Sequence, residues 1–304
     1  RFDEQVSRQA PWASKVLRKD GLADAVCRLV ADARVRRLGL DEHMTLGQYE
    51  SLKSKARKAK VALKPTRGLL VAGRVVKDDG EIAAIERAIR AAERGFLATL
   101  PLVRPGVAER DLAAELEYQM RKSGASGPSF EPIVATGPRG SLPHARASDA
   151  RVRANQPVLF DWGAKVDGYC SDLTRVVAVG RMPAKIREIF GVVAEAQRAG
   201  IAAVRAGATC MSVDQAARKI ISDAGYGGQF GHGLGHGIGL DIHEAPRLSF
   251  RSDETLRAGM VVTVEPGIYL PGVGGVRIED DVLVTATGCR VLSRLARELA
   301  SPRL

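Results

Sequence analysis

Histidine and glycine alternate in one short stretch of the chain, residues 230–246, which reads FGHGLGHGIGLDIHEAP. The chain has five histidines, and three of them lie in this stretch: His232, His236 and His243. Histidine is the side chain that most readily binds a metal ion or carries a proton near neutral pH. The stretch is therefore the first candidate for a metal-binding or catalytic site.

The glycines decide the backbone conformation that this stretch can adopt. The spacing of His232 and His236 fits a helical zinc site. However, each of the five glycines from Gly231 to Gly239 would destabilise a helix by about 1 kcal/mol, or roughly 5 kcal/mol together. We therefore expect extended or looped backbone, in which the glycines let another group approach the main chain closely. The alternative is a glycine-rich loop with incidental histidines, and matching carboxylates elsewhere in the chain disfavour it.

Two carboxylates lie on a hairpin that the sequence predicts over residues 157–179. If its turn is centred between Val166 and Asp167, Asp161 and Asp172 lie opposite each other, with Cβ atoms about 4.5–5.5 Å apart. Two like charges placed in this way on apolar strands repel, and each is unfavourable to bury alone. A bound cation would resolve that conflict.

A second predicted hairpin, residues 260–285, carries two more acids, Glu265 and Glu279. They follow the first two acids by 104 and 107 residues, so both pairs occupy matching places. Four carboxylates and one or more histidines that meet in one cleft describe a two-metal site, since ordinary surface acids do not lie in strands this apolar. The alternative interpretation is a set of structural salt bridges with Arg175 and Arg277.

Helices precede both hairpins at matching positions, so the second part of the chain reads as a duplication. Helical patterns at 79–99 and 108–123 come before the first hairpin, and patterns at 184–204 and 212–224 come before the second. The offset is about 101 to 107 residues throughout. Two halves of this kind predict a pseudo-symmetric α+β fold with its site between the halves.

The first part of the chain differs in character, and we place a domain boundary near residue 75. It contains two helical patterns, 20–36 and 45–59, and a run of seven lysines and arginines within 53–67. That run contributes to the net charge of +11 and could attract an anionic surface. It contains no aromatic residues and no nucleic-acid-binding motif, so we expect a solvated basic helix face and no nucleic-acid partner.

Length and composition describe a soluble globular protein. The chain has 304 residues, of which 45% are hydrophobic and 27% charged, and no apolar run reaches the ~18 residues that a membrane span needs. Cys27, Cys170, Cys210 and Cys289 form no CxxC pair, which favours reduced thiols and a cytoplasmic location. Since the chain starts at Arg1 with no signal-peptide pattern, we expect it to be a fragment whose true N-terminus is missing.

Five motifs together resemble the pita-bread metallopeptidases, specifically the branch of Xaa-Pro aminopeptidase (aminopeptidase P) and Xaa-Pro dipeptidase (prolidase). In chain order they are LPHARAS at 142–148, DWG through SDLTR at 161–175, GHGIG through HE at 235–244, VEPG at 264–267 and RIED at 277–280. The resemblance implies a pita-bread (creatinase/aminopeptidase) catalytic domain over residues 76–304. It further implies a partial creatinase-like N-terminal α/β domain over residues 1–75, in which Arg1–Val6 would form a strand.

The resemblance also implies the roles of the site residues. As ligands of two divalent metal ions it assigns Asp161, Asp172, His236, Glu265 and Glu279. As histidines that hold substrate and move protons it assigns His144, His232 and His243, while Glu265 also takes a proton from water and Arg277 supports the ligands. Four carboxylates and one imidazole favour Mn²⁺, with Co²⁺, Fe²⁺ or Zn²⁺ as alternatives. The ligand pattern has no departures, which argues against a catalytically inactive relative.

The expected reaction is hydrolysis of Xaa-Pro bonds, at the N-terminus of peptides or in dipeptides. Two cations roughly 3.5–4 Å apart would activate a water and polarise the scissile carbonyl. We expect His243 to stabilise the oxyanion, and His144 and His232 to orient the scissile bond or its proline nitrogen. The bond is a tertiary amide with no N–H to donate, and a metal-polarised carbonyl does not need that donor.

Two other functions compete with this expectation. A methionine aminopeptidase-like exopeptidase would share the ligands but not the Pro143-His144 pair with Ser148. A non-catalytic pita-bread binding module is favoured only by the basic run at 53–67. The resemblance further implies a homo-oligomer, a dimer, when the chain is full length, and substrates with proline at the second position. Whether the enzyme is an aminopeptidase or a dipeptidase depends on how the cleft closes around the carboxyl end of the substrate.

Overall fold

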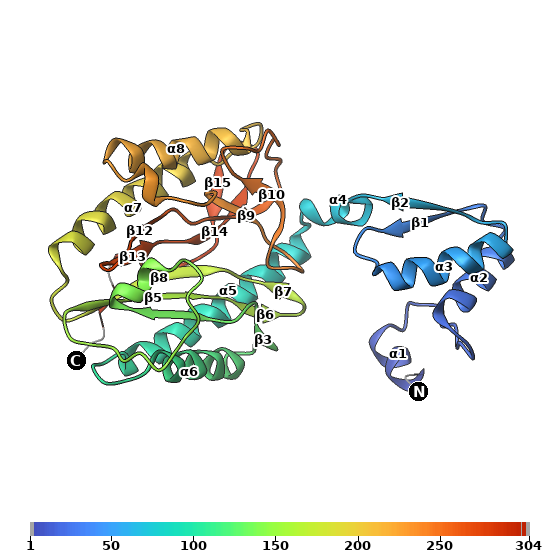
Figure 1. Ribbon diagram of the computed structural model, residues 1–304, viewed down its shortest axis with the longest axis horizontal. Helices are drawn as coiled ribbons and strands as arrows, with labels where there is room; N and C mark the ends of the chain where they lie inside the picture. Colours follow the sequence, from blue (N-terminus) through green and yellow to red (C-terminus); the bar gives the residue numbers. More distant parts are fainter. Residues whose placement is uncertain (1–2, 299, 302–304) are drawn as a thin grey trace. The chain divides into compact units, whose positions relative to one another are not determined.

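The computed structural model describes residues 3–298, 300 and 301, and the chain divides into two compact units between Ala72 and Gly73. Each unit has a hydrophobic core of its own. The boundary predicted near residue 75 falls at the end of helix α4 (Leu69–Val75), which crosses the division (Figure 1).

The first unit packs two helices against two strands. Helices α2 (Leu22–Asp32) and α3 (Leu46–Lys58) lie within the two predicted helical patterns, and the two strands are parallel, with Arg37 opposite Ala62. Leu40, Leu52 and Val61 belong to the core of this unit. Its elements are α1 (Asp3–Gln9), α2 (Leu22–Asp32), β1 (Arg37–Asp41), α3 (Leu46–Lys58) and β2 (Ala62–Thr66).

The strand predicted at Arg1–Val6 is wrong for the residues that the structure describes. Asp3 to Val6 lie in helix α1, and Arg1 and Phe2 lie outside the described residues. Acids in the first turn and Arg8 in the last turn complement the helix dipole. An ion pair between Glu4 and Arg8, one turn apart, adds to this preference.

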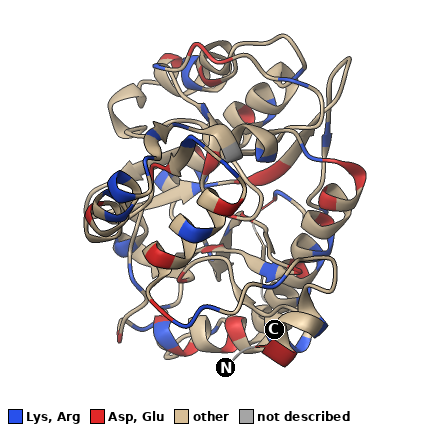
Figure 2. Cartoon of the chain, turned by 90° about the vertical axis from the view of Figure 1, so that its right-hand side faces the viewer, with Lys and Arg blue, Asp and Glu red and all other residues tan. Residues whose placement is uncertain are grey.

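The basic run at 53–67 extends from helix α3 into strand β2, and most of its charged side chains are exposed. Lys55 pairs with Asp24 at 2.7 Å, and Lys53 with Glu50 at 3.6 Å. Figure 2 shows acidic and basic residues next to one another on many other parts of the chain. No helix within residues 3–298 is both long enough and apolar enough to span a membrane.

The first half of the second unit has the predicted order of two helices followed by a hairpin. Asp78 caps helix α5 (Asp79–Thr99) and forms a capping box with Glu81, which explains why the helix begins there. Helix α6 (Glu109–Lys122) packs beside it, and Figure 1 shows both helices next to β5 and β8. The sheet has the order β4-β5-β8, with β4 Ile133–Thr136, β5 Gln156–Trp162 and β8 Leu173–Val179.

The second half repeats this order, which confirms the predicted pair of helix–helix–hairpin halves. Helices α7 (Ala184–Ala203) and α8 (Cys210–Asp223) pack on each other and on the second set of strands (Figure 1). The sheet has the order β10-β9-β11-β14-β15. Its strands are β9 Gly235–Gly237, β10 Glu244–Leu248, β11 Val261–Val264, β14 Asp280–Val284 and β15 Cys289–Val291.

Short elements complete the unit, and an isolated bridge between Thr174 and Glu279 is one of the contacts that join the two halves. The main-chain nitrogen of Glu279 donates to the carbonyl oxygen of Thr174 at 3.2 Å. The remaining strands are β3 (Gly127–Pro128), β6 (Ala164–Val166), β7 (Tyr169–Cys170), β12 (Gly267–Leu270) and β13 (Gly274–Arg277). The 3-10 helices are η1 (Leu100–Leu102), η2 (Gly137–Ser141) and η3 (Gly227–Gln229).

The predicted register of the first hairpin is wrong by two residues. Asp161 lies opposite Thr174, not Asp172, because the turn is centred between Asp167 and Gly168. Both turn residues have positive φ, 51° and 87°, which the type I′ turn requires and which an Asp-Gly pair favours. Since strand side chains alternate with a period of two, the shift keeps both acids on one face of the hairpin.

Candidate active site

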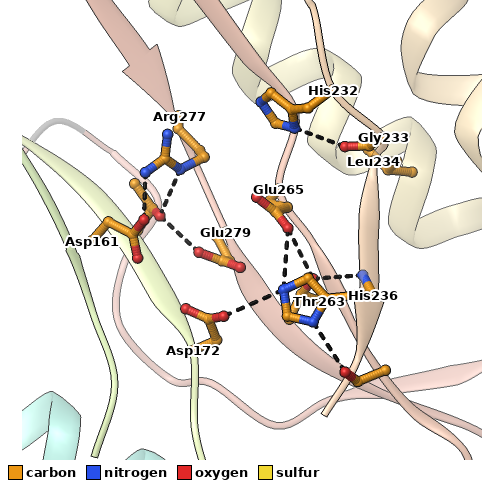
Figure 3. Close-up of polar contacts among 12 residues, drawn as sticks. Asp161, Asp172, His232, Gly233, Leu234, His236, Thr263, Glu265, Arg277 and Glu279 are labelled. Carbon is orange, nitrogen blue, oxygen red and sulfur yellow. Dashed lines mark hydrogen bonds and ion pairs between the residues drawn. The ribbon is translucent and has the colours of Figure 1, made fainter. Parts of the chain in front are cut away.

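A cavity of about 950 Å³ lies between the two halves of the second unit and is lined by residues of both. The structure brings all nine predicted site residues to this cavity: His144, Asp161, Asp172, His232, His236, His243, Glu265, Arg277 and Glu279. Figure 3 shows the side chains of Asp172, Glu265, Glu279 and His236 directed toward one another. Residues far apart in the sequence therefore form one polar cluster in this cavity.

Close backbone packing explains the glycines around His236. A Cβ atom on Gly235 would lie 2.1 Å from the carbonyl oxygen of Thr263, and one on Gly237 would lie 2.1 Å from that of Ala245. No side chain fits at such distances, so the two flanking glycines let strand β9 lie between its neighbours. The predicted extended backbone with close approach of another group is confirmed, and it fixes the place of His236 in the cluster.

The ring of His236 directs an unprotonated nitrogen at carboxylates. Its Nδ1 lies 3.0 Å from the carbonyl oxygen of Gly237, which can only accept, so Nδ1 carries the proton. Burial lowers the pKa of His236 to about 4, and the ring is therefore neutral at pH 7. Its Nε2 lies 3.5 Å from oxygens of both Asp172 and Glu265 (Figure 3). The lone pair of Nε2 therefore faces two carboxylate oxygens and no hydrogen-bond donor. A bound cation would stabilise this arrangement.

The carboxylates themselves are crowded and incompletely paired. Ligand atoms of Asp172, His236 and Glu279 all lie within 4.8 Å of one another. Burial and the neighbouring acids raise the pKa of Asp172 and of Glu279 well above their ordinary values, and burial raises that of Glu265 to about 8. One buried oxygen each of Asp161 and Glu279 has no hydrogen-bond partner. These residues fit a divalent metal centre, because cations would satisfy the free oxygens and offset the repulsion.

Arg277 satisfies only part of this negative charge. Its buried guanidinium forms an ion pair with Asp161 (Figure 3). It also donates to the hydroxyls of Tyr269 at 2.7 Å and Thr174 at 3.1 Å. Burial opposes the charge of Arg277, but Tyr269 and the surrounding acids raise its pKa above the ordinary value. The pKa of Asp161 is raised by burial despite this partner.

The alternative interpretation, structural salt bridges with arginines, is therefore correct for Asp161. It does not account for Asp172, Glu265 and Glu279. Arg175, the second arginine considered from the sequence, pairs with Asp280 at 2.7 Å instead. Among the described residues, no arginine or lysine forms an ion pair with Asp172, Glu265 or Glu279.

His232 belongs to a chain of hydrogen bonds that leads to Arg277. Its Nδ1 lies 2.8 Å from the carbonyl oxygen of Gly233, and its Nε2 lies 2.9 Å from the hydroxyl of Tyr269. Burial, and then the charge of Arg277, lower the pKa of His232 to about 4. The neutral ring therefore accepts from Tyr269 while Tyr269 accepts from Arg277. Sequence reasoning missed Tyr269, although it follows Glu265 by four residues on extended backbone, where strand periodicity places both on one face.

The other two histidines leave their ring nitrogens free of hydrogen bonds to described residues. The ring of His243 contacts that of His236, with centroids 4.4 Å apart, and His144 is exposed in the loop before strand β5. The residue after His243 is the buried Glu244, which accepts from Lys77 at 3.1 Å and from the main-chain nitrogen of Asp241 at 3.1 Å. His144 and His243 are thus placed to contact a bound molecule.

Comparison with known proteins also indicates a metallopeptidase. The model of metallopeptidase family M24 matches residues 83–286. Xaa-Pro dipeptidase of Pyrococcus horikoshii is 41% identical over 265 residues, which are 87% of this chain and 75% of that one.

Two solved structures resemble almost the whole chain. Xaa-Pro dipeptidase from Bacillus anthracis has a TM-score of 0.95 at 43% identity and covers 99% of this chain and 84% of its own. X-Pro aminopeptidase from Thermotoga maritima has a TM-score of 0.93 at 38% identity and covers 99% and 85%. These similarities confirm the predicted pita-bread fold of the second unit.

Proposed function

The chain belongs to metallopeptidase family M24, and on that basis we propose that it hydrolyses the peptide bond that precedes proline, at the N-terminus of peptides or in dipeptides. The observation that carries the proposal is the cluster of Asp172, Glu265, Glu279 and the unprotonated Nε2 of His236 in one cavity. The names of the similar proteins, Xaa-Pro dipeptidase and X-Pro aminopeptidase, support the choice of bond.

We propose that Asp161, Asp172, His236, Glu265 and Glu279 hold two divalent ions, with Mn²⁺ favoured by the oxygen-rich ligand set. When bound, such ions lower the pKa of water and polarise a carbonyl group. Glu265 is the proposed acceptor of the water's proton, since it is the least buried of the four acids: its side chain is 18% exposed, against 12% for Asp161 and 6% for Asp172.

Two histidines contact the substrate directly in this proposal. His243 donates to the oxyanion of the tetrahedral species, and His144 contacts the scissile bond or the proline nitrogen. Both ring nitrogens of His232 are engaged by Gly233 and Tyr269, so we assign His232 to orienting the Tyr269–Arg277 pair beside the site.

Selectivity for proline follows from the apolar wall of the cavity. Phe130, Ile133 and Ile242 line it and suit the pyrrolidine ring. A secondary amide such as that of Ala-Ala would bury an N–H against this wall, and an unpaired buried donor costs about 1–3 kcal/mol. We therefore expect kcat/KM for Ala-Pro to exceed that for Ala-Ala by at least roughly ten- to hundredfold.

The same assay separates the first alternative function. A tripeptide with proline second should be cleaved faster than one that begins with methionine and lacks proline. Equal rates on Ala-Pro and Ala-Ala, or preference for the methionyl peptide, would leave only a general metallopeptidase.

Arg247 favours a dipeptidase over an aminopeptidase. Its side chain lines the cavity from strand β10, and its guanidinium forms no hydrogen bond or ion pair with another described residue. A free cation there can bind the carboxylate of a dipeptide, a charged hydrogen bond worth about 1.5–3 kcal/mol. We expect Arg247→Gln to raise KM for Ala-Pro by roughly ten- to hundredfold and to leave KM for Ala-Pro amide unchanged. An equal change for both substrates would assign Arg247 another role, and a wild-type preference for Arg-Pro-Pro over Ala-Pro would favour the aminopeptidase.

We further propose that residues 1–75 are part of a creatinase-like N-terminal domain, that residues 76–304 are the catalytic domain, and that the full-length protein is a cytoplasmic homodimer. The parallel β1–β2 pair with its two helices supports an α/β domain. Sedimentation of the full-length protein would test the dimer. Membership of metallopeptidase family M24 disfavours the second alternative, a non-catalytic binding module, which would bind no divalent metal.

A further inference from the structure

Glu109 is a fully buried carboxylate in the first turn of helix α6, outside the predicted site. Its Oε1 accepts from the main-chain nitrogen of Thr136 at 2.8 Å. Its Oε2 accepts from the main-chain nitrogen and the hydroxyl of Ser148, at 3.1 and 2.7 Å. The two oxygens of one carboxylate thus hold the two ends of segment 136–148, and His144 lies inside that segment.

Arg139 adds a second connection within the same segment. Its Nε lies 3.0 Å from each oxygen of Glu109, and its Nη2 donates to the carbonyl oxygen of Arg146 at 2.7 Å. On the other side of His144, the carbonyl oxygen of Pro143 accepts from Arg277 at 3.4 Å. The main chain is therefore held immediately before His144 and two residues after it.

The second half holds His232 in a comparable way. Asp214 on helix α8 is fully buried and accepts from Arg218 at 2.7 and 2.9 Å and from the main-chain nitrogen of Leu234 at 3.0 Å. Arg218 in turn donates to the carbonyl oxygens of Phe230 at 3.0 Å and His232 at 2.7 Å. Again a carboxylate of the second helix and an arginine fix the backbone of one histidine.

A buried carboxylate persists only where hydrogen bonds or cations satisfy it, and such charge-assisted bonds are strong and directional. We propose that Glu109, with Ser148 and Arg139, is a positioning residue for His144, and that Asp214 with Arg218 is one for His232. The inference rests on the function proposed above for these two histidines. It also gives a role to Ser148, which the sequence motif includes but the proposed chemistry does not use.

A double-mutant cycle tests the specificity of this coupling. In the wild-type background, Glu109→Gln should lower kcat/KM for Ala-Pro by roughly ten- to hundredfold, because small misplacements of reacting groups have effects of this size. In the His144→Ala background, the same change should have less than about a threefold effect. In the His232→Ala background, it should retain its full effect. Metal content should stay at the wild-type level throughout.

Asp214→Asn is the matched control, since it alters a buried carboxylate of the other half. Its effect should disappear in the His232→Ala background and persist in the His144→Ala background. Ser148→Ala is a milder variant for the case that Glu109→Gln does not fold, and Ser148→Thr, which keeps the hydroxyl, should restore most of the activity. Equal fold-changes of each carboxylate variant in both histidine backgrounds would overturn the inference.

Hydrogen–deuterium exchange measures the same coupling without activity. Glu109→Gln should accelerate exchange in peptides from 136–148 and leave 230–236 unchanged, and Asp214→Asn should do the reverse. Failure of the wild type to cleave Ala-Pro, with this exchange pattern intact, would refute the proposed function but not the positioning contacts. Unchanged exchange in both variants would refute the positioning contacts themselves.

Discussion

Replacing Asp172 by asparagine, or Glu279 by glutamine, should lower both the bound metal and the turnover of Ala-Pro, the latter on the order of 10³-fold. The expected size follows from the several kcal/mol that a metal ion contributes to stabilising charge in the transition state, at 1.36 kcal/mol for each factor of ten. Both side chains are buried, and their ligand atoms lie within 4.8 Å of each other and of His236. Metal content by elemental analysis and kcat for Ala-Pro are the two measurements.

Asp167→Asn is the matched control for these ligand variants. Asp167 lies on the same hairpin as Asp172, but its side chain is exposed and pairs with Arg87 at 2.7 Å. Asparagine tolerates its positive φ, so the turn should be kept. The control should retain metal and turnover. If the Asp172 and Glu279 variants also retained both, the ligand assignment would be wrong.

Replacing His243 by alanine should reduce kcat by roughly 10²–10³ and leave the metal content nearly intact, as expected for the loss of one oxyanion donor. His236→Ala should instead remove metal, because its Nε2 faces Asp172 and Glu265 at 3.5 Å. The rings of His236 and His243 are in contact, with centroids 4.4 Å apart. The two variants therefore test two different proposed roles at neighbouring positions in the cavity.

His43→Ala provides the control for this comparison, since His43 is exposed in the first unit. It should change neither metal content nor kcat. Equal loss of metal in the His236 and His243 variants would show that the two histidines do not divide the roles as proposed.

Local signals in the sequence predict the helices that position the site. Acids at 78–81, followed by isoleucines at helical spacing, predict a helix over 79–99, and helix α5 has these bounds. The site residues are predicted because acids and histidines stand out in apolar strands, and because five motifs resemble one family. The helix signals and the site motifs each lie within short stretches of the chain, so they can be read from the sequence alone.

Contacts between distant segments are what the sequence does not reveal. The register of the first hairpin is an exception, because it depends on a local choice of turn centre, and the Asp167-Gly168 pair itself favours the centre that the structure has. The Glu109–Ser148 contact joins residues 39 apart, and neither residue signals the other. The free guanidinium of Arg247 likewise becomes informative only when the cavity around it is known.

The most direct test of the account is a titration of the chelator-treated, metal-free protein with Mn²⁺, followed by hydrolysis of Ala-Pro and by metal content. The account predicts no measurable hydrolysis without metal and recovery that reaches its maximum at about two ions per chain, since four crowded carboxylates and one imidazole suit a two-ion site. Full hydrolysis of Ala-Pro by the metal-free protein, or restored protein that binds Mn²⁺ and still does not cleave Ala-Pro, would contradict it.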